Sequence, residues 1–122
     1  MFVVEVDNQK RFVVISVAGR VTADEVKAAA QRVREITAQV EPGFVGLADF
    51  RWLESMATGA APFIAEIMDA FAAKKVSAVV RVVPDIHKDI GLNILSHFHY
   101  GPEIRIFTVD TLAEAIQLLA GD

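Results

Sequence analysis

The stretch Phe44-Val-Gly-Leu-Ala-Asp-Phe-Arg-Trp52 decides the fold of this chain. Residues 44–48 carry no charge, and the run ends in a single acid, Asp49. So short and apolar a run is typical of a strand that is buried on both faces. A more polar segment, 50–60, comes next, and Pro62 is best tolerated in the first turn of a helix. The stretch therefore predicts a strand at 44–49, a loop at 50–60 and a helix that begins near 58–62.

Strand and helix patterns alternate on both sides of this stretch. Thr22 and Glu25 form a capping box that predicts the start of the first helix. The strands are expected at 2–6, 11–18, 44–49, 78–83 and 103–109, and the last two helices begin near Pro84 and Asp110. The order ββαβαβαβα, opened by a β-hairpin, indicates an α/β fold with a five-stranded, mostly parallel sheet and helices on both faces. Strands 44–49 and 78–83 should be central, and strand 2–6 should lie at an edge.

Composition narrows the class of protein. A chain of 122 residues is expected to form one domain, 1–122. The absence of cysteine excludes disulfides and thiolate chemistry, and a net charge of -4 without a basic cluster argues against a nucleic-acid partner. No apolar run is long enough to span a membrane, and the N-terminal residues do not resemble a signal peptide. We therefore expect a cytoplasmic protein without a cofactor.

Three segments resemble the SpoIIAA-like or STAS superfamily. They are Val13-Val-Ile-Ser-Val-Ala-Gly-Arg-Val-Thr22, then Leu47-Ala-Asp-Phe50 with Thr58-Gly59, and finally Gly101-Pro-Glu-Ile-Arg-Ile-Phe107 followed by Glu114-Ala-Ile116. This superfamily includes bacterial anti-anti-sigma factors and the cytoplasmic domains of anion transporters. The resemblance implies a SpoIIAA-like fold and a regulatory role exercised by binding a protein partner.

One motif departs from the anti-anti-sigma pattern, which is Asp-Leu-Ser, three further residues, and then Ser-Ser-Gly or Ser-Thr-Gly. Arg51 stands in place of the first serine of that pattern, and the segment up to Gly59 is two residues longer. Ala57 occupies the position where the phosphorylated serine of the family would align. The sequence therefore predicts no phosphorylation switch at this position, and it is similar to the stand-alone SpoIIAA-like proteins of uncertain role.

The candidate binding residues follow the central strand, because open α/β sheets meet ligands and partners beyond the carboxyl ends of their strands. One interpretation is that Asp49 accepts hydrogen bonds from backbone N–H groups while Arg51 is solvated or pairs with Glu54. The other is an anion site made by the Arg51 guanidinium and the backbone at 58–60. The residues predicted to bind a ligand or partner are Asp49, Arg51, Trp52, Leu53, Ser55, Thr58 and Gly59.

The third predicted helix offers a second candidate surface. Leu92 falls nearly opposite Ile90 on a helix, so it should be exposed if Ile90 is buried. This suggests either an interface, with a homodimer as its simplest form, or an apolar pocket beneath the helix. The fold of the lipid-carrying CRAL-TRIO domains is similar, which adds an apolar ligand as an alternative. The residues of this pocket or interface are Phe63, Ile67, Ile90, Leu92 and Ile94.

Catalytic and metal-binding patterns are weak. His97 and His99 diverge on a helix, His87 lies ten residues from His97, and a Ser55–His97–Asp49 triple is what chance offers in a chain of this size. We therefore predict no catalytic residue and no metal. The predicted function is a non-enzymatic regulatory or protein-interaction module that acts through loop 50–60 and the following helix. The alternative is a small apolar or lipid-like ligand carrier with a pocket between the second and third helices.

Overall fold

A computed structural model of the chain describes residues 1–7, 9, 11–83, 100–101 and 103–119. It contains a five-stranded sheet in the order β1-β2-β3-β4-β5. The strands are β1 (Phe2–Val6), β2 (Phe12–Val21), β3 (Val45–Met56), β4 (Ala78–Val82) and β5 (Arg105–Val109). β1 pairs antiparallel with β2, and the other three pairings are parallel. The predicted hairpin, the mostly parallel sheet and the edge position of the first strand are confirmed.

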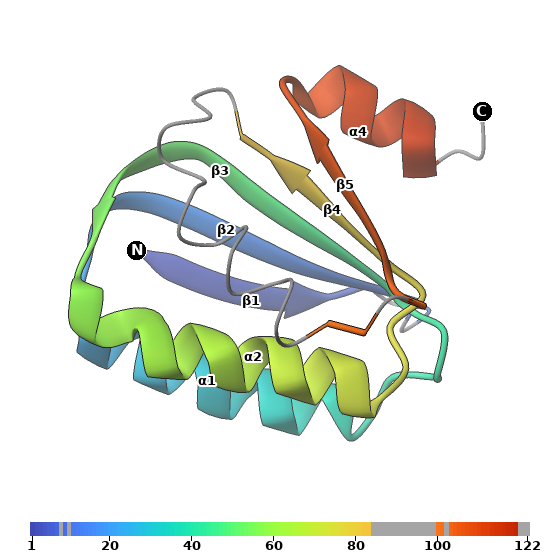
Figure 1. Ribbon diagram of the computed structural model, residues 1–122, viewed down its shortest axis with the longest axis horizontal. Helices are drawn as coiled ribbons and strands as arrows, with labels where there is room; N and C mark the ends of the chain where they lie inside the picture. The colour runs from blue at the N-terminus through green and yellow to red at the C-terminus, as the bar shows by residue number, and fades with distance from the viewer. Residues whose placement is uncertain (8, 10, 84–99, 102, 120–122) are drawn as a thin grey trace.

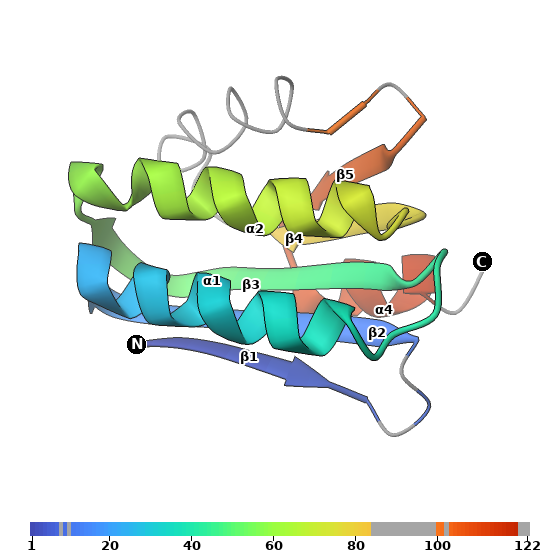
Figure 2. The same ribbon diagram turned by 90° about the horizontal axis from the view of Figure 1, so that it is seen from below.

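Helices cover both faces of the sheet (Figures 1 and 2). α1 (Ala23–Thr37) and α2 (Ala61–Ala73) lie side by side on one face, and the short 3-10 turn η1 (Thr58–Ala60) leads into α2. α4 (Leu112–Leu119) packs on the opposite face over β4 and β5. The third predicted helix, with Ile90, Leu92 and Ile94, lies outside the described residues. The described elements follow the predicted order.

The core between the sheet and the helices α1 and α2 requires a glycine near the start of β3. A Cβ atom at Gly46 would lie 3.0 Å from Cε2 of Phe71, on α2. The absent side chain leaves room for the Phe71 ring, which makes a T-shaped contact with the Phe44 ring at a centroid distance of 5.3 Å. Gly46 and Ala48 thus face α2, whereas Leu47 packs on the α4 side. The small residues of β3 set the distance between the central strand and α2.

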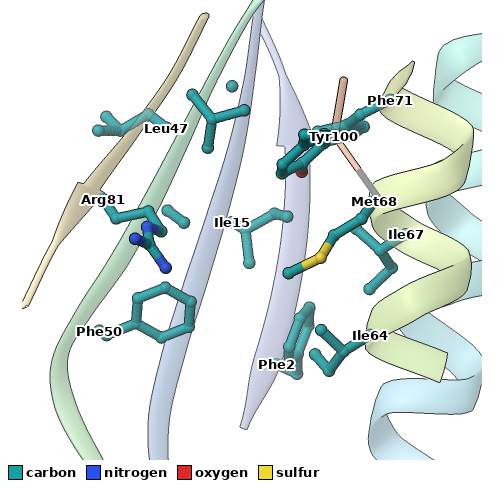
Figure 3. Close-up of a pocket in the computed structure, with 13 residues that line it drawn as sticks. Phe2, Ile15, Leu47, Phe50, Ile64, Ile67, Met68, Phe71, Arg81 and Tyr100 are labelled. Carbon is teal, nitrogen blue, oxygen red and sulfur yellow. The ribbon is translucent and has the colours of Figure 1, made fainter. Parts of the chain in front are cut away.

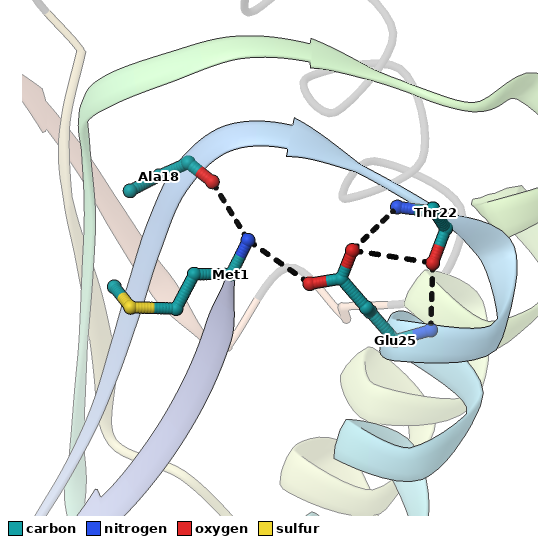
Figure 4. Close-up of polar contacts among 4 residues, drawn as sticks. All are labelled: Met1, Ala18, Thr22 and Glu25. Carbon is teal, nitrogen blue, oxygen red and sulfur yellow. Dashed lines mark hydrogen bonds and ion pairs between the residues drawn. The ribbon is translucent and has the colours of Figure 1, made fainter.

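The start of α1 is held as the sequence predicts. The Thr22 side chain accepts from the backbone N–H of Glu25, and the Glu25 carboxylate accepts from the backbone N–H of Thr22, which completes the capping box (Figure 4). Glu25 also pairs with the Met1 ammonium at 2.9 Å, and that ammonium donates to the Ala18 carbonyl at 2.8 Å. The hydrogen bond from the ammonium is the main cause that lowers the pKa of Glu25. These contacts fasten β1 to both β2 and α1.

The prediction of a loop at 50–60 is wrong for residues 50–56, because β3 continues to Met56. The reason is that β2 also continues past its expected end to Val21. Trp52 pairs with Ala18, and Met56 pairs with Val21. Backbone N–H and C=O groups of residues 50–56 therefore have hydrogen-bond partners in β2, whereas those of a loop would need water or side chains as partners.

Candidate functional site

The carboxyl end of β3 projects beyond the body of the sheet. β4 pairs with β3 only as far as Asp49, opposite Val82, whereas β2 pairs with it as far as Met56. Residues 18–21 and 50–56 therefore form a two-stranded ribbon, which we call the β2–β3 extension. It curves toward η1 and the beginning of α2 (Figure 1). The extension contains most of the residues that the sequence marks as a binding site.

Two register shifts shape the β2–β3 extension. Ser16 and Ala18 of β2 stand opposite Asp49 and Trp52, and Gly19 and Arg20 stand opposite residues 53 and 55. At each shift β3 has one residue more than β2, which is the geometry of a β-bulge. The segment up to Gly59 is two residues longer than in the anti-anti-sigma pattern, and the two bulges together contain two extra residues. Bulges increase local twist and redirect side chains, which fits the curved path of the extension.

Asp49 and Arg51 form a closed pair at the first bulge. Nε of Arg51 donates to both carboxylate oxygens of Asp49 at 3.0 and 3.1 Å, and Nη2 donates to Oδ2 at 2.8 Å. The backbone N–H of Arg51 donates to Oδ1 at 3.0 Å. Partial burial raises the pKa of Asp49, but these hydrogen bonds and the charge of Arg51 outweigh it, so the pKa lies below its ordinary value. The same bonds raise the pKa of Arg51.

This pair favours one of the two interpretations of the sequence. Asp49 accepts a backbone N–H, as the first interpretation expects, but Arg51 pairs with Asp49 rather than with Glu54. Glu54 lies near Arg20 instead, at 3.8 Å. The guanidinium fork of Arg51 is occupied by Asp49, which leaves the anion-site interpretation without its main donor. The pair joins the two residues that flank position 50 at the bulge through backbone and side-chain hydrogen bonds.

The pair also positions the most exposed large side chain of the extension. The Arg51 guanidinium carbon lies 5.6 Å from the centroid of the Trp52 ring, within the range of a cation–π contact. Trp52 is 66% exposed, while the next residue, Leu53, is only 5% exposed and belongs to the core. Ser55, Thr58 and Gly59 are exposed. Trp52 and these polar candidates are thus exposed, whereas Leu53 points into the core.

The second candidate surface is only partly described. Ile67 lines a cavity between α2 and the sheet, and Phe63, half-buried on the same helix, is not among its described lining residues. The other members of the predicted pocket, Ile90, Leu92 and Ile94, lie outside the described residues, as do the three histidines. Within the described ranges no group of three His, Cys, Asp or Glu side chains could hold a metal ion. None of the helices described is long and apolar enough to cross a membrane.

Two polar residues of that cavity were not predicted as site residues. Arg81 is the only charged residue of β4, and it is 5% exposed. Tyr100 is 8% exposed. The signal for Arg81 was present in the sequence as a lone charge within an apolar strand, because such a charge is rarely buried without a specific partner.

This architecture defines a SpoIIAA-like fold, and comparisons with solved structures agree. The anti-sigma factor antagonist SpoIIAA in its unphosphorylated form matches with a TM-score of 0.69 at 19% identity over 100% of both chains. An uncharacterised protein from Shewanella loihica with a SpoIIAA-like fold matches with a TM-score of 0.71 at 14% identity, over 98% of this chain and 92% of that one. An anti-sigma factor antagonist from Mycobacterium paratuberculosis matches with a TM-score of 0.60 at 19% identity, over 98% and 93%.

At these identities the likeness establishes the fold, and it confirms the fold that the sequence resemblance implied. No protein-family model matches the sequence, and no curated protein does. The function therefore has to be argued from the site itself.

Proposed function

We propose that this protein is a non-enzymatic regulatory or protein-interaction module that binds a protein partner through residues 50–60 and the beginning of α2. The observation that carries the proposal is the 66% exposure of Trp52 on a ribbon that the Asp49–Arg51 pair stiffens. Tryptophan is enriched among the residues that dominate binding energy at protein interfaces. A rigid platform also reduces the entropy that is lost on binding.

The likeness to anti-sigma factor antagonists supports a regulatory role, since those proteins act on another protein. The Bacillus determinant SpoIIAA matches this fold also in a phosphorylated form, with a TM-score of 0.62 at 17% identity. Here Ala57, which directly precedes η1, has no hydroxyl group to phosphorylate. We therefore propose that partner binding is not switched by phosphorylation at this position.

Trp52→Ala is expected to weaken partner binding strongly while leaving the fold intact. An exposed side chain adds little to stability, so the free energy of unfolding should stay within about 0.5 kcal/mol of the wild type. The loss of a central interface tryptophan typically costs about 2 kcal/mol or more of binding energy, which is roughly a thirtyfold loss of affinity. The measurement is quantitative affinity enrichment of partners from the native cell extract, followed by binding assays with the purified partner.

Ile116→Ala is the matched control, because Ile116 is a large apolar residue that is 56% exposed on α4, outside residues 50–60 and the beginning of α2. A protein captured by the wild type and by this control, but not by Trp52→Ala, supports the proposal. Equal capture by all three proteins contradicts it.

We also propose that the protein works in the cytoplasm as a homodimer. The motivation is the apolar content of 53% in a chain of 122 residues, because two-fold dimers are the commonest oligomers in which apolar surface is buried. The contact is proposed on the segment that contains Leu92. Sedimentation should give a dimer for the wild type and a monomer for Leu92→Glu. A wild type that sediments as a monomer at high micromolar concentration would rule the dimer out.

A further inference from the structure

A pocket of about 420 Å³, which we call the α4 pocket, lies on the α4 face of the sheet at the amino ends of its parallel strands. The cavity beside α2 that Figure 3 shows is on the other face of the sheet. α4 runs antiparallel to β5 (Figure 1), so its last residues, Leu118 and Leu119, reach this end of the sheet and form one wall of the pocket. Pockets that bind small molecules have volumes of about 300–1,000 Å³. The α4 pocket is therefore large enough for a small organic molecule.

The floor of the α4 pocket contains one row of residues across four strands. Phe12 of β2 pairs with Val45 of β3. Val45 in turn pairs with Ala78 of β4, which pairs with Arg105 of β5. The row is hollow at Ala78, because its side chain is a single methyl group between two larger ones. Neighbouring strands lie about 4.8 Å apart, so Arg105 and Phe12 stand roughly 14 Å apart at the two ends of the row.

Arg105 gives this pocket a positive charge that no carboxylate of the described residues neutralises. Its guanidinium carbon lies 5.0 Å from the centroid of the Phe107 ring, which also lines the pocket. Arg105 is exposed, and it takes part in none of the ion pairs within the described ranges. A guanidinium that packs over a ring keeps N–H donors for a carboxylate, which it can bind through two parallel hydrogen bonds. The contact with Phe107 thus orients the cation without neutralising it.

We propose that the α4 pocket binds an aromatic monocarboxylate of one or two rings, with its carboxylate on Arg105 and its rings over Ala78 and Val45. A dry cavity of about 150 Å³ holds benzene, so a pocket of about 420 Å³ has room for roughly sixteen non-hydrogen atoms at the same density. The eleven-carbon carboxylate 2-naphthoate is smaller than this limit. Phe12 and Phe107 favour an aromatic body, because rings form offset or edge-to-face contacts with each other.

This inference goes beyond the proposed protein interaction and does not rest on it. The described lining of the α4 pocket contains no residue of 50–60 and none of α2. A failure of either proposal therefore leaves the other one standing.

Methyl signals allow a direct test on the full-length chain. In protein labelled with ¹³C at the valine and leucine methyl groups, titration with 2-naphthoate should shift the signals of Val45, Val80 and Leu118 saturably. The signals of Val26 and Val33, which are buried on α1, should stay in place. The neutral 2-naphthamide has the same shape and should bind about fivefold more weakly, because it lacks the charge-assisted hydrogen bonds to a partly exposed cation. These comparisons use only the wild type, so they do not depend on whether a variant folds.

Two variants separate charge from space. Arg105→Gln retains a hydrogen-bond donor without the charge, so it should bind 2-naphthoate and 2-naphthamide equally. Its control is Arg32→Gln, at an exposed position on α1, which should keep the preference for 2-naphthoate. Ala78→Leu fills the hollow of the row and should abolish the shifts with either ligand. Ala113→Leu makes the same change at an exposed position of α4 outside the described lining and should bind as the wild type does.

Unchanged signals of Val45, Val80 and Leu118 at millimolar 2-naphthoate would overturn the proposal. So would equal affinity of the wild type for 2-naphthoate and 2-naphthamide, because recognition would then not depend on charge. A preference for 2-naphthoate that survives in Arg105→Gln would place the carboxylate elsewhere and would count against the proposal in the same way. Parallel shifts of the pocket signals and of Val26 would indicate nonspecific binding and would also overturn it.

Discussion

Phe71→Ala is expected to lower the free energy of unfolding by about 3–5 kcal/mol. Phe71 is among the largest fully buried side chains of the described core, with 2% exposure. Its removal loses the transfer free energy of the ring and leaves a void between α2 and Gly46, which cannot fill it. The edge-to-face contact with Phe44 is lost as well. Urea denaturation followed by circular dichroism measures the change.

Phe63→Ala is the matched control, because Phe63 lies on the same helix but is only half-buried. It should cost clearly less than Phe71→Ala. A loss below about 1 kcal/mol for Phe71→Ala would show that the core collapses around the void, contrary to the prediction.

The same contact predicts a coupling between the central strand and the helix. Gly46→Ala would place a Cβ atom 3.0 Å from the Phe71 ring, so one of the two must move. In a Phe71→Leu background that crowding is relieved, and Gly46→Ala should cost less than it does in the wild type. A double-mutant cycle measures the difference, and strict additivity would mean that the ring yields without strain.

Asp49→Ala is expected to cost about 1–3 kcal/mol of stability, because the backbone N–H of Arg51 loses its acceptor at a bulge where ladder pairing is interrupted. The measurement is the same urea denaturation at neutral pH. Glu41→Ala, at an exposed position between α1 and β3, is the control and should leave stability unchanged. An unfolding curve of Asp49→Ala that superimposes on that of the wild type would contradict a structural role for the carboxylate.

The effect of Asp49 should also depend on pH. The pKa of Asp49 is lower in the folded state than its ordinary value of 3.8, so its contribution to stability is complete above that value. The contribution is lost as the pH falls through the lower, folded-state pKa. The stability difference between the wild type and Asp49→Ala should therefore be constant from pH 7 to about pH 5 and should shrink on further acidification. A difference that is unchanged at the lowest pH at which the protein stays folded would show that charge plays no part.

Local patterns in the sequence were enough to predict the class of fold. The uncharged run that ends at Asp49 indicated a buried central strand, and the Thr22–Glu25 capping box marked the first residues of α1. These features depend on residues close together in the chain, which a linear reading can recognise. The hairpin and the alternation of strands with helices then restrict the topology, because parallel strands need long crossover connections.

Tertiary structure alone decided the shape of the candidate site. Residues 50–56 look like a loop by composition, and they form a strand because β2 extends beside them. The partner of Arg51, the burial of Leu53 and the exposure of Trp52 all follow from that pairing and from its two register shifts. Arg81 lines a cavity because its position in β4 directs its side chain to the face of the sheet that α2 covers. The physical reason is the same throughout: pairing and packing join residues far apart in sequence, so no local period or propensity encodes them.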